Sequence, residues 1–478
     1  MSVTFTADLQ TGPVGGDAKL RKRPRGEVEP SPYTLRAAFA HGDIATRGSA
    51  VLMGLGNLVR GQLAKGALFL LGEVAFVVLL IRNGIDSLAA LKVLGPVTQG
   101  GQMWDEEGNF VNVNPTNSVE VLLYGVSWIF VILAFVLFWG TAVRSAYKAQ
   151  VLDASKGRAP SFADDLKELF DSRIHVTLMS LPTLGILVFT VVPLAFMISM
   201  AFTDFDKNHP VAFNWVGLQN FADMFSSTGS ATSGVNLDIF MRVLVWTLVW
   251  AVLATFLNFF LGMFVAMVIL RKGTRLKSMW RAIFSMSIAV PQFVSLLIIN
   301  QMLQDQGIVN QLLKNYGLID SSLPFFTNAT WARATVVIVN LWIGIPYTIM
   351  QVTGILQNVP GELYEAAKID GANWWQTYRK ITLPFIFFVL TPYLIVTFTA
   401  NINNFNVIYL LSKGDPTPVG ESAGQTDLFI TWLYKMTVDR GNYNMGAVIG
   451  IMTFIVLAVV ALITYRRSGS YRNEEGFR

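Results

Sequence analysis

Long apolar runs separated by short polar stretches dominate the pattern of this chain. A transmembrane helix needs roughly 20 mostly apolar residues, and eight of the runs qualify as spans. They cover residues 66–83, 119–143, 176–202, 243–270, 282–303, 334–356, 385–403 and 445–465. The pattern predicts an all-α polytopic membrane protein with eight transmembrane helices.

The polar connections between the runs alternate in charge. Basic residues follow the second, fourth and eighth runs, and acidic residues lie in the opposite connections. Because basic loops remain cytoplasmic, we expect both termini, and the connection between the sixth and seventh runs, to face the cytoplasm. The basic residues are Arg144, Lys148, Lys156, Arg158, Arg271, Lys272, Arg275, Lys277, Arg281, Arg466 and Arg467, and the acidic ones are Asp105, Glu106, Glu107, Asp204 and Asp206.

The first 48 residues are polar, contain the basic run KLRKRPRG and lack the apolar core of a secretory signal. They predict a disordered cytoplasmic arm. Such a run could bind nucleic acid, but beside a transmembrane helix an orientation signal or a contact with lipid headgroups is favoured. Residues 49–175 predict a helix at the cytoplasmic interface, followed by two leading transmembrane helices.

Composition excludes several kinds of chemistry. The chain is 53% hydrophobic and 14% charged, and it has no cysteine for a disulfide or a thiolate metal site. Its three histidines, His41, His175 and His209, are scattered, so neither a metal cluster nor a nucleophile with its base is visible. No GxxxxGK[ST] loop for nucleotide phosphates occurs. A polytopic enzyme is therefore the weakest alternative.

Two of the outer connections are longer than simple turns. Residues 84–118 and 404–442 each run to about 35 residues rich in Gly, Pro, Asn and Asp. They are candidates for contact with an external partner, and tolerated insertions are an equally weighted alternative. No internal repeat is evident.

Polar side chains form a stripe within each of two consecutive runs. Such residues are costly in a bilayer unless they face a partner helix or a water-filled path. Their amides and hydroxyls offer sugar hydroxyls donors and acceptors without a charge, whereas the alternative role is hydrogen bonding between helices. The stripes are Asn340, Ile343, Gly344 and Tyr347 at helical offsets of 0, 3, 4 and 7, and Thr397, Asn401 and Asn404 at offsets of 0, 4 and 7.

Glu73 is the clearest acidic residue within an apolar run. It could serve as the proton or ion site of a secondary transporter. Because no second charged group completes a relay deep in the membrane, a buried hydrogen bond to a neighbouring helix is favoured.

A polar island, PGELYEAAKIDGANWW, connects the sixth and seventh runs. Pro360 suits the first turn of a helix, and Gly371 can adopt the left-handed conformation that ends one. The pattern predicts a short surface helix of roughly three turns at most. Its small alanines would allow close approach by another protein, and Glu365 and Asp370 could meet basic groups. Trp374, Trp375 and Tyr378 could anchor the next segment at the interface.

This island resembles a known family motif. Glu365-Ala366-Ala367, Gly371, Ile381 and Leu383-Pro384 match EAA-x3-G-x9-I-x-LP at every fixed position, the pattern of the permease subunits of binding-protein-dependent ABC importers. Residues 176–478 resemble the six-helix ABC importer permease core with its EAA loop at 360–384. The extra leading spans are similar to those of MalF-like permeases of maltose and maltodextrin importers.

The resemblance implies a transmembrane permease subunit of an ATP-driven importer for maltose, malto-oligosaccharide or a related sugar. It implies these partners besides membrane lipids: a MalG-like second permease subunit, two copies of a MalK-like cytoplasmic ATPase, an extracytoplasmic sugar-binding protein and the sugar. No nucleic acid is expected. The chain itself would hold no cofactor and catalyse no reaction, because ATP and Mg would be bound by the partner ATPase.

The resemblance also assigns residue roles. The island becomes a cytoplasmic coupling helix seated in a cleft of the ATPase, in which Glu365 pairs with a basic residue and Gly371 permits the turn. Ala400 stands where such a permease has an aromatic residue, and Thr397 replaces a serine, so the identity of the sugar is open. The implied ATPase-coupling residues are Glu365, Ala366, Ala367, Asp370 and Gly371, and the implied sugar-binding residues are Asn340, Ile343, Gly344, Tyr347, Thr397, Ala400, Asn401 and Asn404.

Overall fold

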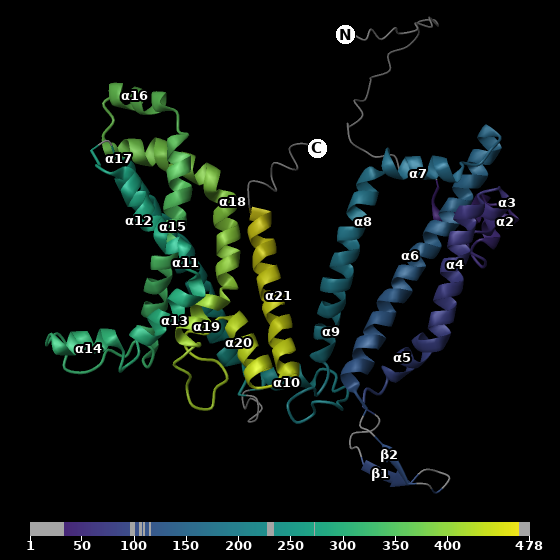
Figure 1. Cartoon of the computed structure of the whole chain (residues 1–478), viewed down its shortest axis with the longest axis horizontal. Helices are drawn as coiled ribbons and strands as arrows, with labels where there is room; N and C mark the ends of the chain where they lie inside the picture. The colour runs from purple at the N-terminus through teal and green to yellow at the C-terminus, as the bar shows by residue number, and fades with distance from the viewer. Residues whose placement is uncertain are drawn as a thin grey trace, which may run out of the picture. The chain divides into compact units, whose positions relative to one another are not determined.

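A computed structural model describes residues 33–95, 101–104, 108, 110–113, 116–226, 234–271 and 273–467. Almost all regular structure in these residues is helical (Figure 1). The chain divides into two compact units. The first consists of Met1–Ala75, Val136–Lys167 and Val459–Arg478, and the second of Phe76–Phe135 and Glu168–Ala458. Most of the basic arm and the acidic run Asp105, Glu106 and Glu107 lie outside the described residues.

Six helical stretches in the described residues are long and apolar enough to cross a membrane. Three of them contain more than one element, joined end to end or by a short break. They are α4 (Leu63–Leu79) with η1 (Leu80–Gly84) and α5 (Ile85–Ala90); α6 (Ser118–Lys156); α8 (Ile174–Ile186) with η2 (Leu187–Val191) and α9 (Val192–Met200); α11 (Leu237–Leu270); α15 (Ala329–Gln357); and α17 (Trp374–Thr377) with η3 (Tyr378–Thr382), α18 (Leu383–Ile402) and α19 (Phe405–Ser412).

The remaining elements are shorter or bent. The bent pair is α12 (Lys277–Ala289) and α13 (Gln292–Met302), and α21 (Tyr443–Arg467) has its apolar part at Tyr443–Val459. The other elements are α1 (Leu35–His41), α2 (Ile44–Gly48), α3 (Leu55–Val59), α7 (Phe162–Phe170), α10 (Gln219–Phe225), α14 (Ile308–Asn315), α16 (Gly361–Ile369), α20 (Phe429–Tyr434), η4 (Lys435–Asp439), β1 (Gly101–Trp104) and β2 (Phe110–Val113).

The all-α membrane fold is confirmed, but the count of eight spans is not. Each predicted run coincides with one of these helical stretches, but α12 and α13 meet at 86°, so they make one broken span or a re-entrant turn. Pro291 lies at this break and cannot donate the backbone hydrogen bond that would continue α12. The connection 84–118 also contains an antiparallel pair, with Gly101 opposite Val113 and Trp104 opposite Phe110.

In the first unit, the beginning of α4 packs against the later part of α6. A Cβ added at Gly72 would lie 2.6 Å from the ring of Phe138, so a glycine is required for this approach. The rings of Phe69 and Phe138 have centroids 5.4 Å apart. The indole N–H of Trp139 donates to the carbonyl of Ala50 at 2.9 Å, which ties the preceding segment to α6.

The end of the predicted arm is ordered rather than disordered. Residues 35–48 form α1 and α2, and their N-termini are capped by the side chains of Thr34 and Asp43. Ala38 and Thr46 are buried, and the Thr46 hydroxyl donates to the side chain of Gln150 on α6 at 2.9 Å. Caps and burial supply the stability that a polar composition alone did not predict.

In the second unit, α11 is the central helix, and α15 and α18 both pack on it. Two glycines make the α11–α15 approach close. A Cβ at Gly262 would lie 2.5 Å from Thr348, and a Cβ at Gly344 would lie 2.4 Å from the Asn258 amide. Small residues at helix interfaces allow such backbone contact in membranes.

Three apolar clusters follow α11 along its length. Phe240 belongs to the cluster nearest α20, Trp250 to the middle cluster and Phe259 to the cluster shared with α18. All three rings are buried. In Figure 1, α16 lies at one end of this helical group, and α14 and α20 lie at the other.

Candidate functional site

The stripe on α15 has two different environments. Asn340 is only 5% exposed, and its amide nitrogen has no hydrogen-bond partner among the described residues. Ile343 packs against the middle apolar cluster, and Gly344 lies against the Asn258 side chain of α11. Tyr347, in contrast, is 47% exposed. The stripe therefore runs from a buried amide to an open aromatic ring.

The stripe at the end of α18 is connected by hydrogen bonds. The amide of Asn401 donates to the hydroxyl of Thr255 on α11 at 3.1 Å and accepts from Asn404 at 3.3 Å. The Asn404 side chain also accepts from the backbone N–H of Val407 at 3.3 Å and thereby caps α19. Both amides therefore form the kind of hydrogen bond within the chain that the alternative role, helix packing, requires. Of the other two members, Thr397 is half-buried and Ala400 is exposed.

Both stripes meet α11 at neighbouring turns. Asn258 lies against Gly344, and Thr255, three residues earlier, bonds to Asn401. Thr255 is buried, and the Asn258 side-chain oxygen has no hydrogen-bond partner in the described chain. The sequence prediction missed these two α11 residues because each is an isolated polar residue in an apolar run. Their spacing of i and i+3 was the available signal.

The predicted surface helix is α16. Its N-cap is Pro360, its C-cap is Asp370, and Gly371 follows with a φ of +73°. The N–H of Gly371 donates to the Lys368 carbonyl at 3.2 Å, and the N–H of Ala372 donates to the Ala367 carbonyl at 2.9 Å. This pair of bonds is a Schellman motif, which requires the left-handed residue. The predicted helix end at Gly371 is confirmed.

The two faces of α16 differ in exposure. Glu365, Ala366 and Asp370 are exposed, whereas Ala367 is buried, so its side chain does not belong to the presented surface. The buried face also carries Tyr364, whose hydroxyl lies 3.1 Å from the Thr382 hydroxyl.

Two apolar residues that the sequence prediction missed complete the outer face of α16. Leu363 is 45% exposed and Ile369 is 85% exposed. Large apolar side chains beside small ones on a free helix face suit a protein contact. Trp374 and Tyr378, the predicted interfacial anchors, stack with centroids 5.6 Å apart just beyond this helix.

Glu73 has a structural partner in the first unit. Its carboxylate accepts a hydrogen bond from the backbone N–H of Met53 at 2.8 Å. Met53 is fully buried and precedes α3. The carboxylate thus holds the segment before α3 against α4. Within the described ranges, no group of acidic or histidine side chains could hold a metal ion.

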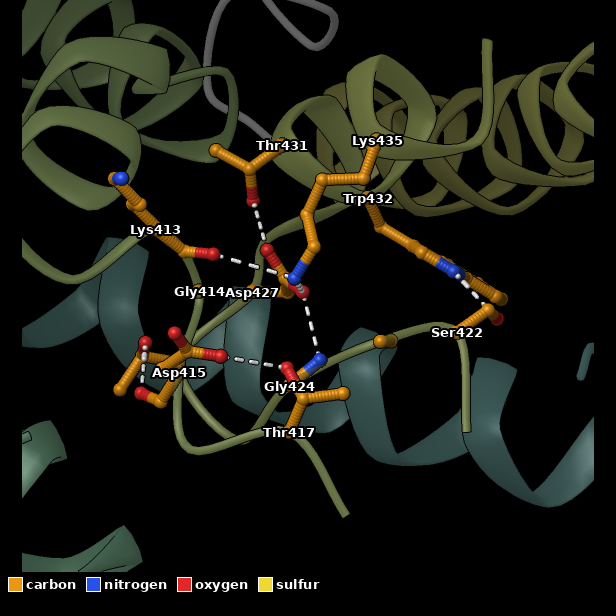
Figure 2. Close-up of polar contacts among 12 residues, drawn as sticks. Lys413, Gly414, Asp415, Thr417, Ser422, Gly424, Asp427, Thr431, Trp432 and Lys435 are labelled. Atoms are coloured by element: carbon orange, nitrogen blue, oxygen red, sulfur yellow. Dashed lines mark hydrogen bonds and ion pairs between the residues drawn. The ribbon is translucent and has the colours of Figure 1, made fainter. Parts of the chain in front are cut away.

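The connection after α19 contains a buried ionic network that the sequence did not reveal. Figure 2 shows Lys435, Thr431 and Gly424 converging on Asp427. The Asp427 carboxylate is completely buried and accepts from the Lys435 ammonium at 2.7 Å and the Gly424 N–H at 2.7 Å. A Cβ at Gly414 would lie 2.0 Å from this carboxylate, so only glycine fits there. Burial raises the pKa of Asp427, against the opposing effect of the Lys435 charge.

The same connection is tied to α11 and α15. Arg242 on α11 forms an ion pair with Glu421, one of whose bonds measures 3.0 Å. Arg333 on α15 donates to the carbonyl of Gln425 at 2.9 Å. Charge-assisted bonds to a loop are stronger than neutral ones. The network therefore fixes the connection on the ends of two long helices.

Known proteins resemble this chain over most of its length. Residues 258–469 match the family described as binding-protein-dependent transport system inner membrane component. The galactooligosaccharides transport system permease protein GanP of Bacillus subtilis (strain 168) is 34% identical over 435 residues, 89% of this chain and 97% of that protein. The maltodextrin transport system permease protein MdxF of the same organism is 30% identical over 439 residues, 89% of this chain and 96% of that protein.

A solved structure also matches part of the chain. It is a bacterial ABC transporter involved in the import of the acidic polysaccharide alginate, at 21% identity and a TM-score of 0.49, over 63% of this chain and 96% of that one. The sequence relatives are permeases of transport systems. The candidate spans of this chain fit the same kind of protein, a multi-pass membrane subunit for translocation. The chain belongs to the family of binding-protein-dependent transport system inner membrane components, together with these sugar permeases.

Proposed function

We propose that this chain is the permease subunit of an ATP-driven importer for maltodextrins, galactooligosaccharides or a related oligosaccharide. The observation that carries the proposal is the similarity to two oligosaccharide permeases over 96% or more of their lengths. Apolar helices that can cross a membrane and the free face of α16 fit a translocation subunit that depends on a partner for energy.

The partners follow from this role. A MalG-like second permease subunit would complete the sugar path, and an extracytoplasmic sugar-binding protein would deliver the sugar. Two copies of a MalK-like ATPase would bind ATP and Mg on the cytoplasmic side. This orientation places both termini and α16 in the cytoplasm, in agreement with the basic connections.

The coupling site would be the outer face of α16. Leu363, Ala366 and Ile369 offer an apolar surface, and Glu365 offers a carboxylate to a basic group of the ATPase. The Schellman motif and the contact of Tyr364 with Thr382 hold the helix firmly. A firm contact is needed because closure of the ATPase dimer must move the helices rather than deform α16.

Sugar would bind along the two stripes beside α11. Tyr347 would stack on a pyranose face, and Thr397 with the small Ala400 would leave room for the sugar ring. Asn340 retains an unpaired donor for a sugar hydroxyl. Asn401 and Asn404 would keep their bonds within the chain and offer their remaining donors and acceptors. Alternating access would then expose this site first outward and later inward.

Uptake by proteoliposomes that contain the complete assembly tests the proposal. Labelled maltotriose or a galactotriose is supplied outside with the binding protein, and ATP is enclosed with the ATPase. We expect accumulation that requires ATP and is unaffected when proton and sodium gradients are dissipated. Import that continues without ATP but stops when an ion gradient is removed would establish an ion-coupled transporter instead.

A further inference from the structure

A cavity of about 430 Å³ lies between α12 and the last turns of α15, and its lining includes no residue of either stripe. This volume falls within the roughly 300–1,000 Å³ typical of small-molecule sites. Its lining combines hydroxyl, amide and guanidinium groups with an apolar wall. The lining residues are Ser278, Arg281, Ala282, Ser285, Ile349, Met350, Thr353, Gly354 and Gln357.

Thr353 is the residue that points to a ligand. It is only 5% exposed, and its hydroxyl has no hydrogen-bond partner in the part of the chain that the structure describes. An unpaired buried hydroxyl costs free energy, which a ligand hydroxyl in the cavity would recover. Because Thr353 lines the cavity, it is placed to make this bond.

The other polar groups of the cavity are also free to bind. The side chains of Ser285, Arg281 and Gln357 form no hydrogen bond with another described residue. Together they offer donors and acceptors, and the lining contains no carboxylate. A planar guanidinium can donate to two adjacent hydroxyls at once. Such a set suits a neutral molecule rich in hydroxyl groups.

Gly354 and the apolar wall shape the space. A Cβ at Gly354 would have no atom within 4 Å, so this glycine leaves the cavity open without being required by packing. Ile349 and Met350 provide the apolar surface on which the C–H face of a sugar ring can rest.

We propose that this cavity is a second sugar-binding site, located between the stripe on α15 and the coupling helix α16. The proposal rests on the proposed import of oligosaccharides. The lining on α15 begins at Ile349, just after Tyr347, and Thr353 follows Tyr347 by six residues, a rise of about 9 Å, so the cavity adjoins the stripe and the same sugar can reach both. Gln357 ends α15 just before α16, so movement of α16 would change the wall and release the sugar.

Cysteine labelling tests the site directly, because the chain has no cysteine of its own. Ser285→Cys places a thiol in the cavity, and Ser172→Cys places one in the exposed link between α7 and α8. Each variant is assembled with cysteine-free partner subunits and treated with N-ethylmaleimide at increasing concentrations of maltotriose or a galactotriose. We expect at least one of these sugars to slow labelling at Ser285→Cys at least fivefold and saturably, and neither to affect labelling at Ser172→Cys.

Second variants separate the ligand role from folding. In the Ser285→Cys background, Thr353→Val should raise the sugar concentration for half-protection about fivefold, the effect of one hydrogen bond, and Thr353→Ser should restore it. Gly354→Phe should fill the cavity and abolish protection, whereas Gly354→Ala should preserve it. Equal half-protection in Thr353→Val and the parent would overturn the role of that hydroxyl.

The same vesicles are assayed for ATP-driven uptake of both sugars, which distinguishes two failures. Uptake without any protection at Ser285→Cys would overturn the second site and leave the proposed function standing. Absence of ATP-driven uptake for both sugars would overturn the proposed import of maltodextrins and galactooligosaccharides, and with it the second site for these sugars.

Discussion

Replacement of Lys435 by methionine should loosen the connection that follows α19. The Lys435 ammonium is the only cation that contacts the buried Asp427 carboxylate in the described chain, at 2.7 Å, and its side chain is itself 13% exposed. Methionine is of similar length but leaves the carboxylate without its counter-charge. Breaking a buried pair in this way typically costs about 3–5 kcal/mol.

The assay is hydrogen exchange at the backbone N–H of Gly424, which donates to Asp427. A loss of about 3 kcal/mol in local stability corresponds to roughly 100-fold faster exchange, since each 1.4 kcal/mol is a factor of ten. Lys413→Met is the matched control, because the Lys413 side chain is exposed and only its carbonyl contacts Lys435, at 3.2 Å. The control should exchange within a factor of about two of the parent.

The pH dependence gives this prediction a second test. Burial raises the pKa of Asp427 in the folded protein, so the folded state binds a proton more tightly than the unfolded state. Stability from this group is therefore greater at low pH and is lost as pH rises through the raised pKa. Without Lys435 the pKa should rise further, and Lys435→Met should be less destabilised at pH 5 than at pH 8. Equal exchange in Lys435→Met and Lys413→Met at both pH values would refute the reasoning.

Three further predictions concern transport in proteoliposomes that contain the complete assembly. Glu365→Lys should lower ATP-driven uptake at least tenfold with normal membrane insertion, whereas Glu362→Lys, also exposed on α16, should retain most activity; equal effects would remove the special role of Glu365. Tyr347→Ala and Asn401→Leu should each reduce uptake at least fivefold without loss of the assembled complex on size-exclusion chromatography, and unchanged uptake in both would assign them to packing. Glu73→Gln should change uptake less than twofold, because the amide oxygen still accepts from the Met53 N–H; loss of uptake with intact protein would support an ion site.

The helical membrane fold was predictable because bilayer thickness sets the length of an apolar run. The bend between α12 and α13 was not, although Pro291 marks its position. Hydropathy is an average over a run of residues, and it carries no information about a change in the direction of the helix axis within that run. Order at residues 35–48 was missed for a related reason: Thr46 is buried by contact with Gln150, which is 104 residues away in the sequence.

The helix α16 was the most predictable part of the candidate site, because its limits depend on local chemistry. Proline at the start and glycine at a φ of +73° fix the ends of α16 whatever surrounds them. Its exposed surface was less predictable. Adjacent alanines differ, since Ala366 is exposed and Ala367 is buried, and Ile369 became visible as a contact residue only when the face was known.

The sequence predicted only which residues of each stripe share a helix face, and helical periodicity cannot predict what that face contacts. Helical offsets place residues on one side of a helix, but the neighbour that covers that side comes from elsewhere in the chain. α11 covers Gly344 and binds Asn401, whereas Tyr347 stays exposed although the next residue, Thr348, packs on Gly262 of α11. The Asp427 network was invisible for the same reason, since its glycine neighbours meet it only after the connection has folded.

A single helix links the features that the proposed mechanism requires. α15 carries Asn340 and Tyr347 in its middle, contributes Thr353 to the cavity near its end, and leads within four residues from Gln357 to α16. An α-helix transmits axial movement because backbone hydrogen bonds join successive turns, and α15 lacks one such donor at Pro346. Gly344 of α15 also packs so closely on Asn258 of α11 that a Cβ would not fit between them. A movement of α16 would therefore change the cavity before it changes the stripe. The sugar would leave the cavity first, and the stripe would return to its earlier conformation last.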